Sequence, residues 1–296
     1  MTNNEISEIR DYVEKRKVIL PDGTKVSALG QGTWYMGENY SKKNEEIKSL
    51  KLGLELGMNL IDTAEMYGDG LSEELVGEVI NDIRKDVFLI SKVYPNNAGL
   101  NSISKACENS LKRLKTDYLD LYLLHWRGGI PLEETIEGME RLKKEGKILR
   151  WGVSNFDTDD MEELLNKSMG GNCVVNEVLY HLGSRGIEFD LLPWQRKKNI
   201  PTIAYCPLAQ GGLLKNELLR NETLDEIAEE HSVKPLQIAL AWTIREKNII
   251  SIPKASTVDH VIENAKATSI TLSSKDIERL EVVFQKPNRK MSLDIV

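Results

Sequence analysis

The sequence predicts an α/β fold of the (β/α)8 class, the TIM barrel, with an N-terminal β-hairpin that caps the bottom of the barrel. Short apolar runs alternate with charged stretches of helical period along the whole chain, and this alternation is typical of parallel β/α units. The units recur at spacings of roughly 25 to 35 residues, and a barrel takes about 250 residues. The chain of 296 residues is long enough for all eight units.

Each expected strand is a short apolar run that ends at polar residues. The expected strands are residues 26–32, 58–62, 87–92, 119–125, 149–154, 173–178, 200–206 and 249–253. In a parallel barrel all eight strands point the same way, so the polar residues that follow them meet at one mouth.

Amphipathic stretches between the strands predict the surrounding helices. Clear examples are residues 44–56, 102–115, 131–146 and 223–247. The last stretch fills a longer gap and predicts two short helices that divide before Pro235, one of them additional to the barrel pattern. Thr223 with Glu226, and Ser273 with Asp276, have the spacing of capping boxes, which begin helices.

Asp22 and Gly23 separate two β-prone runs within residues 17–29 and predict the hairpin. We expect a single barrel domain that takes in the whole chain, with residues 1–15 as an N-terminal extension and residues 286–296 as a short tail. Because the tail is short, we expect no long segment over the mouth and therefore an open, permissive pocket.

A doubly wound open sheet is the main alternative fold, and it would carry a Gly-x-Gly-x-x-Gly string after a strand. The nearest string holds Gly30 and Gly32, but the third glycine is displaced to Gly37, and no helix-opening pattern follows. The barrel is therefore favoured.

Composition excludes several classes of function. Hydrophobic residues make up 41% and charged residues 29% of the chain, which favours a packed globular core. No apolar run approaches the roughly 20 residues of a membrane span, and the polar start of the chain lacks a signal core. Three scattered cysteines suit neither a disulfide framework nor a zinc knuckle. We therefore expect a cytoplasmic protein with no membrane partner. The net charge of −7 makes nucleic acid a poor partner as well, because binding a polyanion requires a basic face.

Ionisable and polar side chains stand at the ends of the expected strands, or in the loops that follow. They are Asp62, Tyr67, Lys92, His125, Ser154, Asn155, Glu177, Tyr205 and Lys254. A free tyrosine has a pKa of about 10, and we expect the Lys92 ammonium to lower the pKa of Tyr67, with Asp62 holding Lys92 in place. Tyr67 then becomes a general acid for a carbonyl oxygen that His125 orients. Side chains carry no hydride, so a nicotinamide must supply it.

Five strings identify a family. Residues 59–68 (NLIDTAEMYG), 88–95 (FLISKVYP), 118–126 (YLDLYLLHW), 146–156 (GKILRWGVSNF) and 252–264 (IPKASTVDHVIEN) resemble the aldo-keto reductases. The resemblance runs from about residue 16 to residue 285. It implies a barrel that binds NAD(P)H across its mouth and a catalytic tetrad of Asp62, Tyr67, Lys92 and His125. The protein then reduces aldehydes or ketones to alcohols, with Tyr67 as the acid.

The resemblance also implies the cofactor contacts. Ser154 and Asn155 match the carboxamide partners, and Tyr205 matches the ring that stacks on the nicotinamide. Further contacts carried over in this way are Gly32, Thr33, Leu208, Gln210, Gly212, Lys254, Ser256, Thr257 and Asn264, while Trp34 and Trp126 match the walls of the substrate pocket. Residues 180–194 resemble short bacterial members, which often reduce aldehydes of the methylglyoxal type.

Three positions depart from the family pattern. Glu177 stands where a glutamine usually contacts the carboxamide; a carboxylate can accept from the amide but cannot donate back, and its charge could alter the relative binding of the two redox states of the cofactor. Cys206 replaces a common serine. His260 replaces an arginine that often holds the 2′-phosphate. We expect NADPH to be preferred, with weaker discrimination against NADH than an arginine gives.

Three other functions stay open from the sequence. A Schiff-base aldolase would need Lys92 desolvated and without an acidic partner. A zinc hydrolase would need several histidines at strand ends, and only His125 is clearly placed there. A non-catalytic NADPH-binding redox sensor or regulatory subunit could retain the same barrel, although all four tetrad positions are filled.

Overall fold

The computed structural model describes residues 1–209, 218 and 220–296. The strands are β1 (Lys17–Ile19), β2 (Lys25–Ser27), β3 (Gln31–Gly32), β4 (Leu60–Asp62), β5 (Phe88–Val93), β6 (Leu121–Leu124), β7 (Trp151–Ser154), β8 (Cys173–Leu179), β9 (Thr202–Tyr205) and β10 (Ile249–Ser251). The α-helices are α1 (Asn3–Lys15), α2 (Lys43–Glu55), α3 (Leu71–Ile80), α4 (Ile103–Leu114), α5 (Leu132–Lys144), α6 (Thr158–Asn166), α7 (Leu191–Lys198), α9 (Glu222–Glu230), α10 (Pro235–Thr243), α11 (Val258–Lys266) and α12 (Ser274–Val283). Short 3-10 helices are η1 (Tyr40–Lys42), η2 (Tyr67–Gly70), η3 (Arg84–Asp86), η4 (Pro95–Asn97), η5 (Gly170–Asn172), η6 (Gly186–Glu188) and η7 (Ala267–Ser269).

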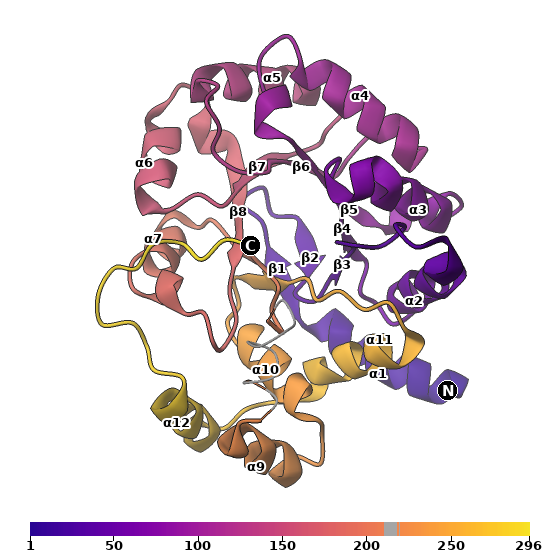
Figure 1. The fold of residues 1–296 in the computed structure, drawn as a ribbon, viewed down its shortest axis with the longest axis vertical. Coiled ribbons are helices and arrows are strands. Elements are labelled where there is room, and N and C mark those ends of the chain that lie inside the picture. The colour runs from indigo at the N-terminus through magenta and orange to yellow at the C-terminus, as the bar shows by residue number, and fades with distance from the viewer. Residues whose placement is uncertain (210–217, 219) are drawn as a thin grey trace.

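The eight strands from β3 to β10 form one parallel sheet in chain order. The sheet closes where the loop and strand around Gly30 meet the end of β10: the amide of Gly30 donates to the Ser251 carbonyl at 2.8 Å, and the amide of Gly32 donates to the Pro253 carbonyl at 3.2 Å. Helices surround this barrel (Figure 1). The predicted (β/α)8 barrel is confirmed.

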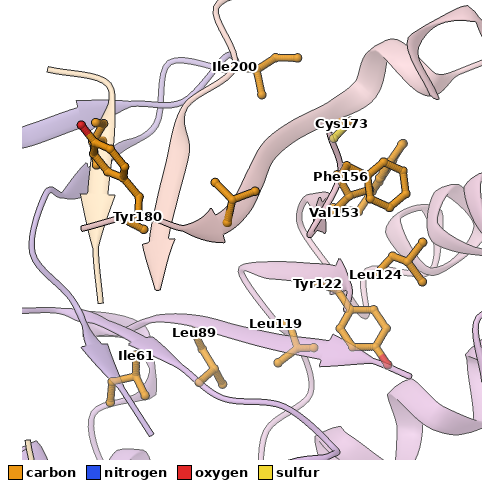
Figure 2. Close-up of a cluster of buried hydrophobic side chains, with 14 of the residues drawn as sticks. Ile61, Leu89, Leu119, Tyr122, Leu124, Val153, Phe156, Cys173, Tyr180 and Ile200 are labelled. Carbon is orange, nitrogen blue, oxygen red and sulfur yellow. The ribbon is translucent and has the colours of Figure 1, made fainter. Parts of the chain in front are cut away.

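The two faces of the sheet pack against different partners. Side chains on the outer face, among them Ile61, Leu89, Tyr122 and Val153, form a core beneath the helices (Figure 2). Inward side chains such as Leu123 and Ile203 fill the barrel interior. A parallel sheet that is covered on both faces needs nearly continuous apolar strands, and the apolar runs of the sequence have this pattern.

The predicted hairpin is also confirmed. β1 and β2 pair antiparallel, with Val18 opposite Val26, and both valines are buried in the interior cluster of the barrel. Figure 1 shows the two strands at the centre of the ring of barrel strands. Asp22 in the turn accepts a hydrogen bond from Arg150 Nε at 2.6 Å, just before β7. The hairpin therefore closes one end of the barrel, and the site must lie at the other.

Two details differ from the sequence predictions, and a third adds to them. The run at residues 26–32 is not one strand: its start belongs to the hairpin strand β2, and only Gln31 and Gly32 form the barrel strand β3. Thr223 does not cap α9, because the Asn221 side chain accepts from the Leu224 amide instead. Residues 1–15 hold a capped helix, α1, which packs on α11.

Other local predictions hold. Ser273 and Asp276 form the expected capping box at the start of α12, and α9 and α10 are the two helices that divide before Pro235. In the part of the chain that the structure describes, no helix combines the length and apolar character needed to cross a membrane.

Residues after α12 return to the barrel mouth, where the C-terminus lies beside β8 (Figure 1). Lys290 anchors this tail through ion pairs with Asp157 (3.5 Å), Asp159 (3.6 Å) and Asp190 (3.3 Å). The hydroxyl of Ser184 donates to Asp294 near the end of the chain. The tail is therefore held at two points along its length.

Candidate active site

A cavity of about 470 Å³ lies at the C-terminal ends of the strands. Sixteen residues that the sequence singled out line it: Gly32, Thr33, Trp34, Asp62, Tyr67, His125, Trp126, Ser154, Asn155, Glu177, Tyr205, Leu208, Lys254, Ser256, Thr257 and His260. The volume is that of an ordinary small-molecule site. The expectation that these side chains meet at one mouth is confirmed.

Two of the predicted residues that the structure describes do not line the cavity. Lys92 is fully buried behind Asp62 and Tyr67. Asn264 lies one helical turn beyond His260 and faces a separate small hollow beside Gln31, so its placement does not support a direct cofactor contact. Gln210 and Gly212 lie outside the described residues.

Asp62, Lys92 and Tyr67 are in direct contact. Asp62 ends β4 and Lys92 lies in the neighbouring strand β5, so their side chains meet across the parallel pair: Nζ lies 2.5 Å from Asp62 Oδ1. The same ammonium donates to the Thr63 carbonyl at 3.1 Å and to the Tyr67 hydroxyl at 3.2 Å. All three donor positions of Lys92 are therefore used, and its orientation is fixed.

Burial sets the protonation of Tyr67. The side chain is only 8% exposed, and burial raises the pKa of its phenol further than the Lys92 ammonium lowers it, with the charges of Asp62 and Glu177 adding to the rise. The expected lowering of the Tyr67 pKa is therefore wrong for the site without cofactor. Desolvation wins because the ammonium is largely neutralised by its own carboxylates. Tyr67 rests as a neutral phenol with a proton to give.

Glu177 completes the buried cluster through its contact with Lys92. The sequence pattern places Glu177 only beside the carboxamide and does not predict this contact. Its Oε1 lies 3.4 Å from Lys92 Nζ. Burial, and then the charge of Asp62, raise the pKa of Glu177 to about 8, although Lys92 opposes the shift. Burial likewise raises the pKa of Asp62, against Lys92. Burial disfavours the ammonium of Lys92, but the two carboxylates outweigh it and hold its pKa above the ordinary value.

His125 follows β6 and lies against two aromatic rings. Its ring centroid is 5.8 Å from that of Tyr67 and 4.8 Å from that of Trp126. Burial, helped by the charge of Lys92, lowers the pKa of His125 to about 2, so the imidazole is neutral. A neutral imidazole can hydrogen-bond a carbonyl oxygen without competing for its proton.

A hydrogen-bond network organises the opposite side of the cavity. The Asn155 amide nitrogen donates to the His125 carbonyl at 3.2 Å and to the Ser154 hydroxyl at 3.2 Å. Ser154 donates in turn to the Glu177 carbonyl at 2.9 Å, and the Tyr205 hydroxyl donates to Asn155 Oδ1 at 2.8 Å. Side chains from β7 and β9 are thus tied to the end of β8.

The backbone of several lining residues is strained. Tyr35, Asn155, Cys206 and Ala209 all line the cavity and have φ between 48° and 66°, a left-handed conformation that costs non-glycine residues free energy. Gly32 meets a different constraint, because a Cβ there would lie 2.7 Å from the Ile252 carbonyl. The closest approach of β3 to the chain after β10 therefore requires glycine.

The sequence did not predict the role of the tail. Ile295 and Val296 line the cavity together with Tyr205. The short tail therefore reaches the mouth, because ion pairs carry it back there. The available signal was the apolar residues Met291, Leu293, Ile295 and Val296 near the end of the tail.

The far end of the cavity is polar and exposed. α11 begins there, capped by Thr257, whose hydroxyl accepts from the His260 amide at 3.4 Å. Lys254 and His260 are both exposed at this end. Free amides at a helix start and a nearby lysine attract anions. A phosphate group would fit at this end of the cavity.

The geometry disfavours two alternatives. A Schiff-base lysine must be free to act as a nucleophile, whereas Lys92 is buried and paired with Asp62. Within the described ranges, no group of His, Cys, Asp or Glu is arranged to hold a metal ion.

A (β/α)8 barrel with a buried Asp–Lys–Tyr cluster beside a neutral histidine at its mouth is typical of an enzyme that acts on a small bound molecule. The model of the Aldo/keto reductase family matches residues 28–284. The chain belongs to the aldo/keto reductase family.

Individual relatives are close. The chain is 50% identical over 284 residues to methylglyoxal reductase YeaE of Escherichia coli (strain K12), covering 96% of this chain and 100% of that one. It is 35% identical over 272 residues to glyoxal reductase of Bacillus subtilis (strain 168), covering 91% and 93%. A crystal structure of an aldo/keto reductase from Klebsiella pneumoniae in complex with NADP and acetate superposes with a TM-score of 0.93, at 49% identity and covering 95% of this chain and 99% of that one.

Proposed function

We propose that the chain reduces small aldehydes, 2-oxoaldehydes of the methylglyoxal class foremost, with NADPH as reductant. The chain is an NADP-dependent oxidoreductase of carbonyl groups, and its family membership and the relatives in complex with NADP support this. The observation that carries the proposal is the contact of Tyr67 with Lys92 beside a neutral His125 in the cavity.

The cavity fits a nicotinamide dinucleotide. Glu177 Oε2 is buried and finds no hydrogen-bond partner among the described residues, so a polar group is missing from its surroundings. Ser154 and Asn155 stand beside it to hold a carboxamide, and Tyr205 offers a ring to the nicotinamide. Lys254 and the start of α11 would hold the phosphate of the adenosine end.

Each side chain then has one task. When bound, NADPH supplies the hydride that the side chains lack. His125 donates a hydrogen bond to the substrate oxygen and orients it. Tyr67 gives its proton to that oxygen as negative charge develops there. Lys92 stabilises the phenolate that remains, and Asp62 keeps Lys92 charged and in place.

Aromatic side chains limit the substrate. Trp34 lies 6.2 Å from Tyr67 between ring centroids, and Trp126 packs on His125. With Ile295 and Val296 they line the same cavity as Tyr67. A short, flat dicarbonyl suits such an apolar enclosure, and the names of the two relatives above favour the same class.

The test is a substrate screen. NADPH oxidation is followed by absorbance with methylglyoxal, glyoxal, an aliphatic monoaldehyde and a bulky aromatic aldehyde. We expect kcat/KM to be highest for a 2-oxoaldehyde. A protein that binds NADPH yet oxidises it with none of these would overturn the proposal and favour the redox sensor, for which the structure offers no specific observation.

A further inference from the structure

Two carboxylates share one ammonium at the floor of the cavity. Asp62 Oδ1 lies 2.5 Å and Glu177 Oε1 lies 3.4 Å from Lys92 Nζ. The three residues are at most 2% exposed. If all three were charged, a net negative charge would be buried, which is costly unless a cation or a proton neutralises it.

Among the residues that the structure describes, none beside Lys92 brings a second cation to Glu177. The titratable groups that face it are Asp62 on β4, Tyr67 on η2, Lys92 on β5, Tyr205 on β9 and Cys206 after β9. Apart from Lys92 these groups are neutral or negative. Burial, and then the charge of Asp62, disfavour ionisation of Glu177 more than the Lys92 ammonium favours it, so a proton on one of the two carboxyls relieves the excess buried negative charge. Of the two carboxyl groups, that of Glu177 lies farther from the Lys92 ammonium, so Glu177 holds the proton.

Glu177 also lies where the nicotinamide is proposed to bind. It pairs in register with Ser154 on β7, and its neighbour strand β9 ends at Tyr205. The unsatisfied Oε2 lines the same cavity as these groups. A nicotinamide ring held between Ser154, Asn155 and Tyr205 would therefore lie next to the carboxyl of Glu177. The charge of that carboxyl depends on whether it holds one proton.

We propose that Glu177 couples the redox state of the cofactor to a proton: it is a neutral acid beside the reduced ring and a carboxylate beside the oxidised, cationic ring. This inference rests on the proposed binding of NADP(H) in the cavity. The positive charge of the oxidised ring replaces the missing second cation, so it releases the proton from Glu177. A glutamine at this position has no proton to release.

The charge of Glu177 sets the direction in which pH changes the relative affinity for NADP⁺ and NADPH. Rising pH ionises Glu177, and the carboxylate attracts the cationic ring but not the neutral one. Affinity for NADP⁺ relative to NADPH therefore rises with pH across neutrality, by about tenfold per pH unit at the limit of one linked proton. Low pH favours release of the oxidised cofactor.

The experiment measures binding, not turnover. Dissociation constants of NADP⁺ and NADPH are determined by titration calorimetry at pH 6, 7, 8 and 9 for the wild-type protein and for Glu177→Gln. Both cofactors carry the same 2′-phosphate, so its titration cancels in the ratio of the two constants. We expect the wild-type ratio to move at least tenfold towards NADP⁺ between pH 6 and 9. For Glu177→Gln, the ratio of the two dissociation constants should not change with pH and should equal the wild-type ratio at pH 6.

Proton release gives a second readout. Calorimetry of NADP⁺ binding near pH 7 in buffers of different ionisation enthalpy counts the protons released. We expect a larger release with NADP⁺ than with NADPH, and no difference in Glu177→Gln. His231→Asn is the matched control, because it removes a histidine that pairs with Asp276 and does not line the cavity, and it should leave the wild-type pH slope of the ratio.

The outcomes are distinct. If neither cofactor binds at any pH, the proposed function fails. If both bind and the wild-type ratio is flat with pH, or if Glu177→Gln keeps the wild-type slope, the coupling through Glu177 is overturned. Should Glu177→Gln fold poorly, the buffer dependence of the wild-type protein alone still decides, since equal proton release with both cofactors contradicts the inference.

Discussion

The ammonium of Lys92 lies 3.2 Å from the hydroxyl oxygen of Tyr67, and neither group is open to bulk solvent. Burial keeps the proton on the phenol, while the ammonium stands ready to stabilise the phenolate once the proton has left. A phenol that holds its proton at rest and loses it only to a developing alkoxide is suited to general acid catalysis.

Tyr67→Phe tests this role. The change removes one hydroxyl and keeps the ring that packs against Trp34 and His125. We expect kcat for the best aldehyde to fall by about 10²- to 10⁴-fold, the usual contribution of a general acid, with the dissociation constant of NADPH little changed. Stopped-flow kinetics and fluorescence titration measure the two quantities. Near-normal turnover would contradict the assignment.

Lys92→Met tests the charge balance of the cluster. Removal of the ammonium leaves Asp62 and Glu177 buried without a cation, and breaking such a pair typically costs about 3–5 kcal/mol. Urea denaturation measures the free energy of unfolding. The double variant Lys92→Met, Asp62→Asn removes one buried charge as well, so it should recover part of that loss. Equal stability of the single and double variants would argue against the ion pair as the cause.

The stability of the cofactor-free protein should fall as pH rises. Glu177 has a pKa of about 8 in the folded protein and an ordinary one, near 4.3, when unfolded. Between these values the folded state binds more protons, so the free energy of unfolding decreases with rising pH. Urea denaturation at pH 5 and 8.5 should show a loss on the order of a few kcal/mol. The Glu177→Gln variant should lose less stability than the wild-type protein over this pH range. If the free energy of unfolding depended on pH equally in the two proteins, the raised pKa of Glu177 would be contradicted.

Lys290→Gln tests the anchoring of the tail. The variant removes the cation that three aspartates hold, so Ile295 and Val296 should leave the cavity more often. We expect KM for small aldehydes to rise several-fold and bulky aldehydes to be reduced relatively better. Lys286→Gln is the matched control, because Lys286 pairs with Glu281 on α12 instead. Equal effects of the two variants on KM would show that the Lys290 ion pairs have no specific role in holding the tail at the cavity.

His260→Arg tests cofactor preference. His260 is exposed at the start of α11, where an arginine can clamp a phosphate with a permanent charge. We expect the ratio of kcat/KM for NADPH over NADH to rise about tenfold, mainly through a lower KM for NADPH. An unchanged ratio would place the 2′-phosphate elsewhere.

The barrel is predictable from the sequence because its strands are buried on both faces and so appear as apolar runs. The common direction of the strands then places Asp62, His125 and Tyr205 at one mouth. The hairpin is equally readable from Asp22 and Gly23. A helix in residues 3–15 is also signalled, by the spacing of Thr2 and Glu5 and by apolar residues at helical period, so the expectation of a mere extension there understates the local pattern.

Other features depend on contacts that no local pattern reveals. The net shift of the Tyr67 pKa depends on how completely Lys92 is neutralised, which requires knowing that Glu177 reaches it. Asn221 outcompetes Thr223 as a cap because the helix begins earlier, at Glu222. Ion pairs between Lys290 and three distant aspartates bring Ile295 back to the mouth, and their sequence separation hides them.

The seam between β3 and β10 has no continuous ladder, since β3 has only two residues and the seam is made through single bridges at Leu29 and Gly32. Amide hydrogens there should exchange with solvent sooner than those of the long strands β5 and β8. A dinucleotide that contacts Gly32 on one side and the start of α11 on the other would bridge this seam. Slower exchange at Gly30 and Gly32 would then report cofactor occupancy directly, without any turnover.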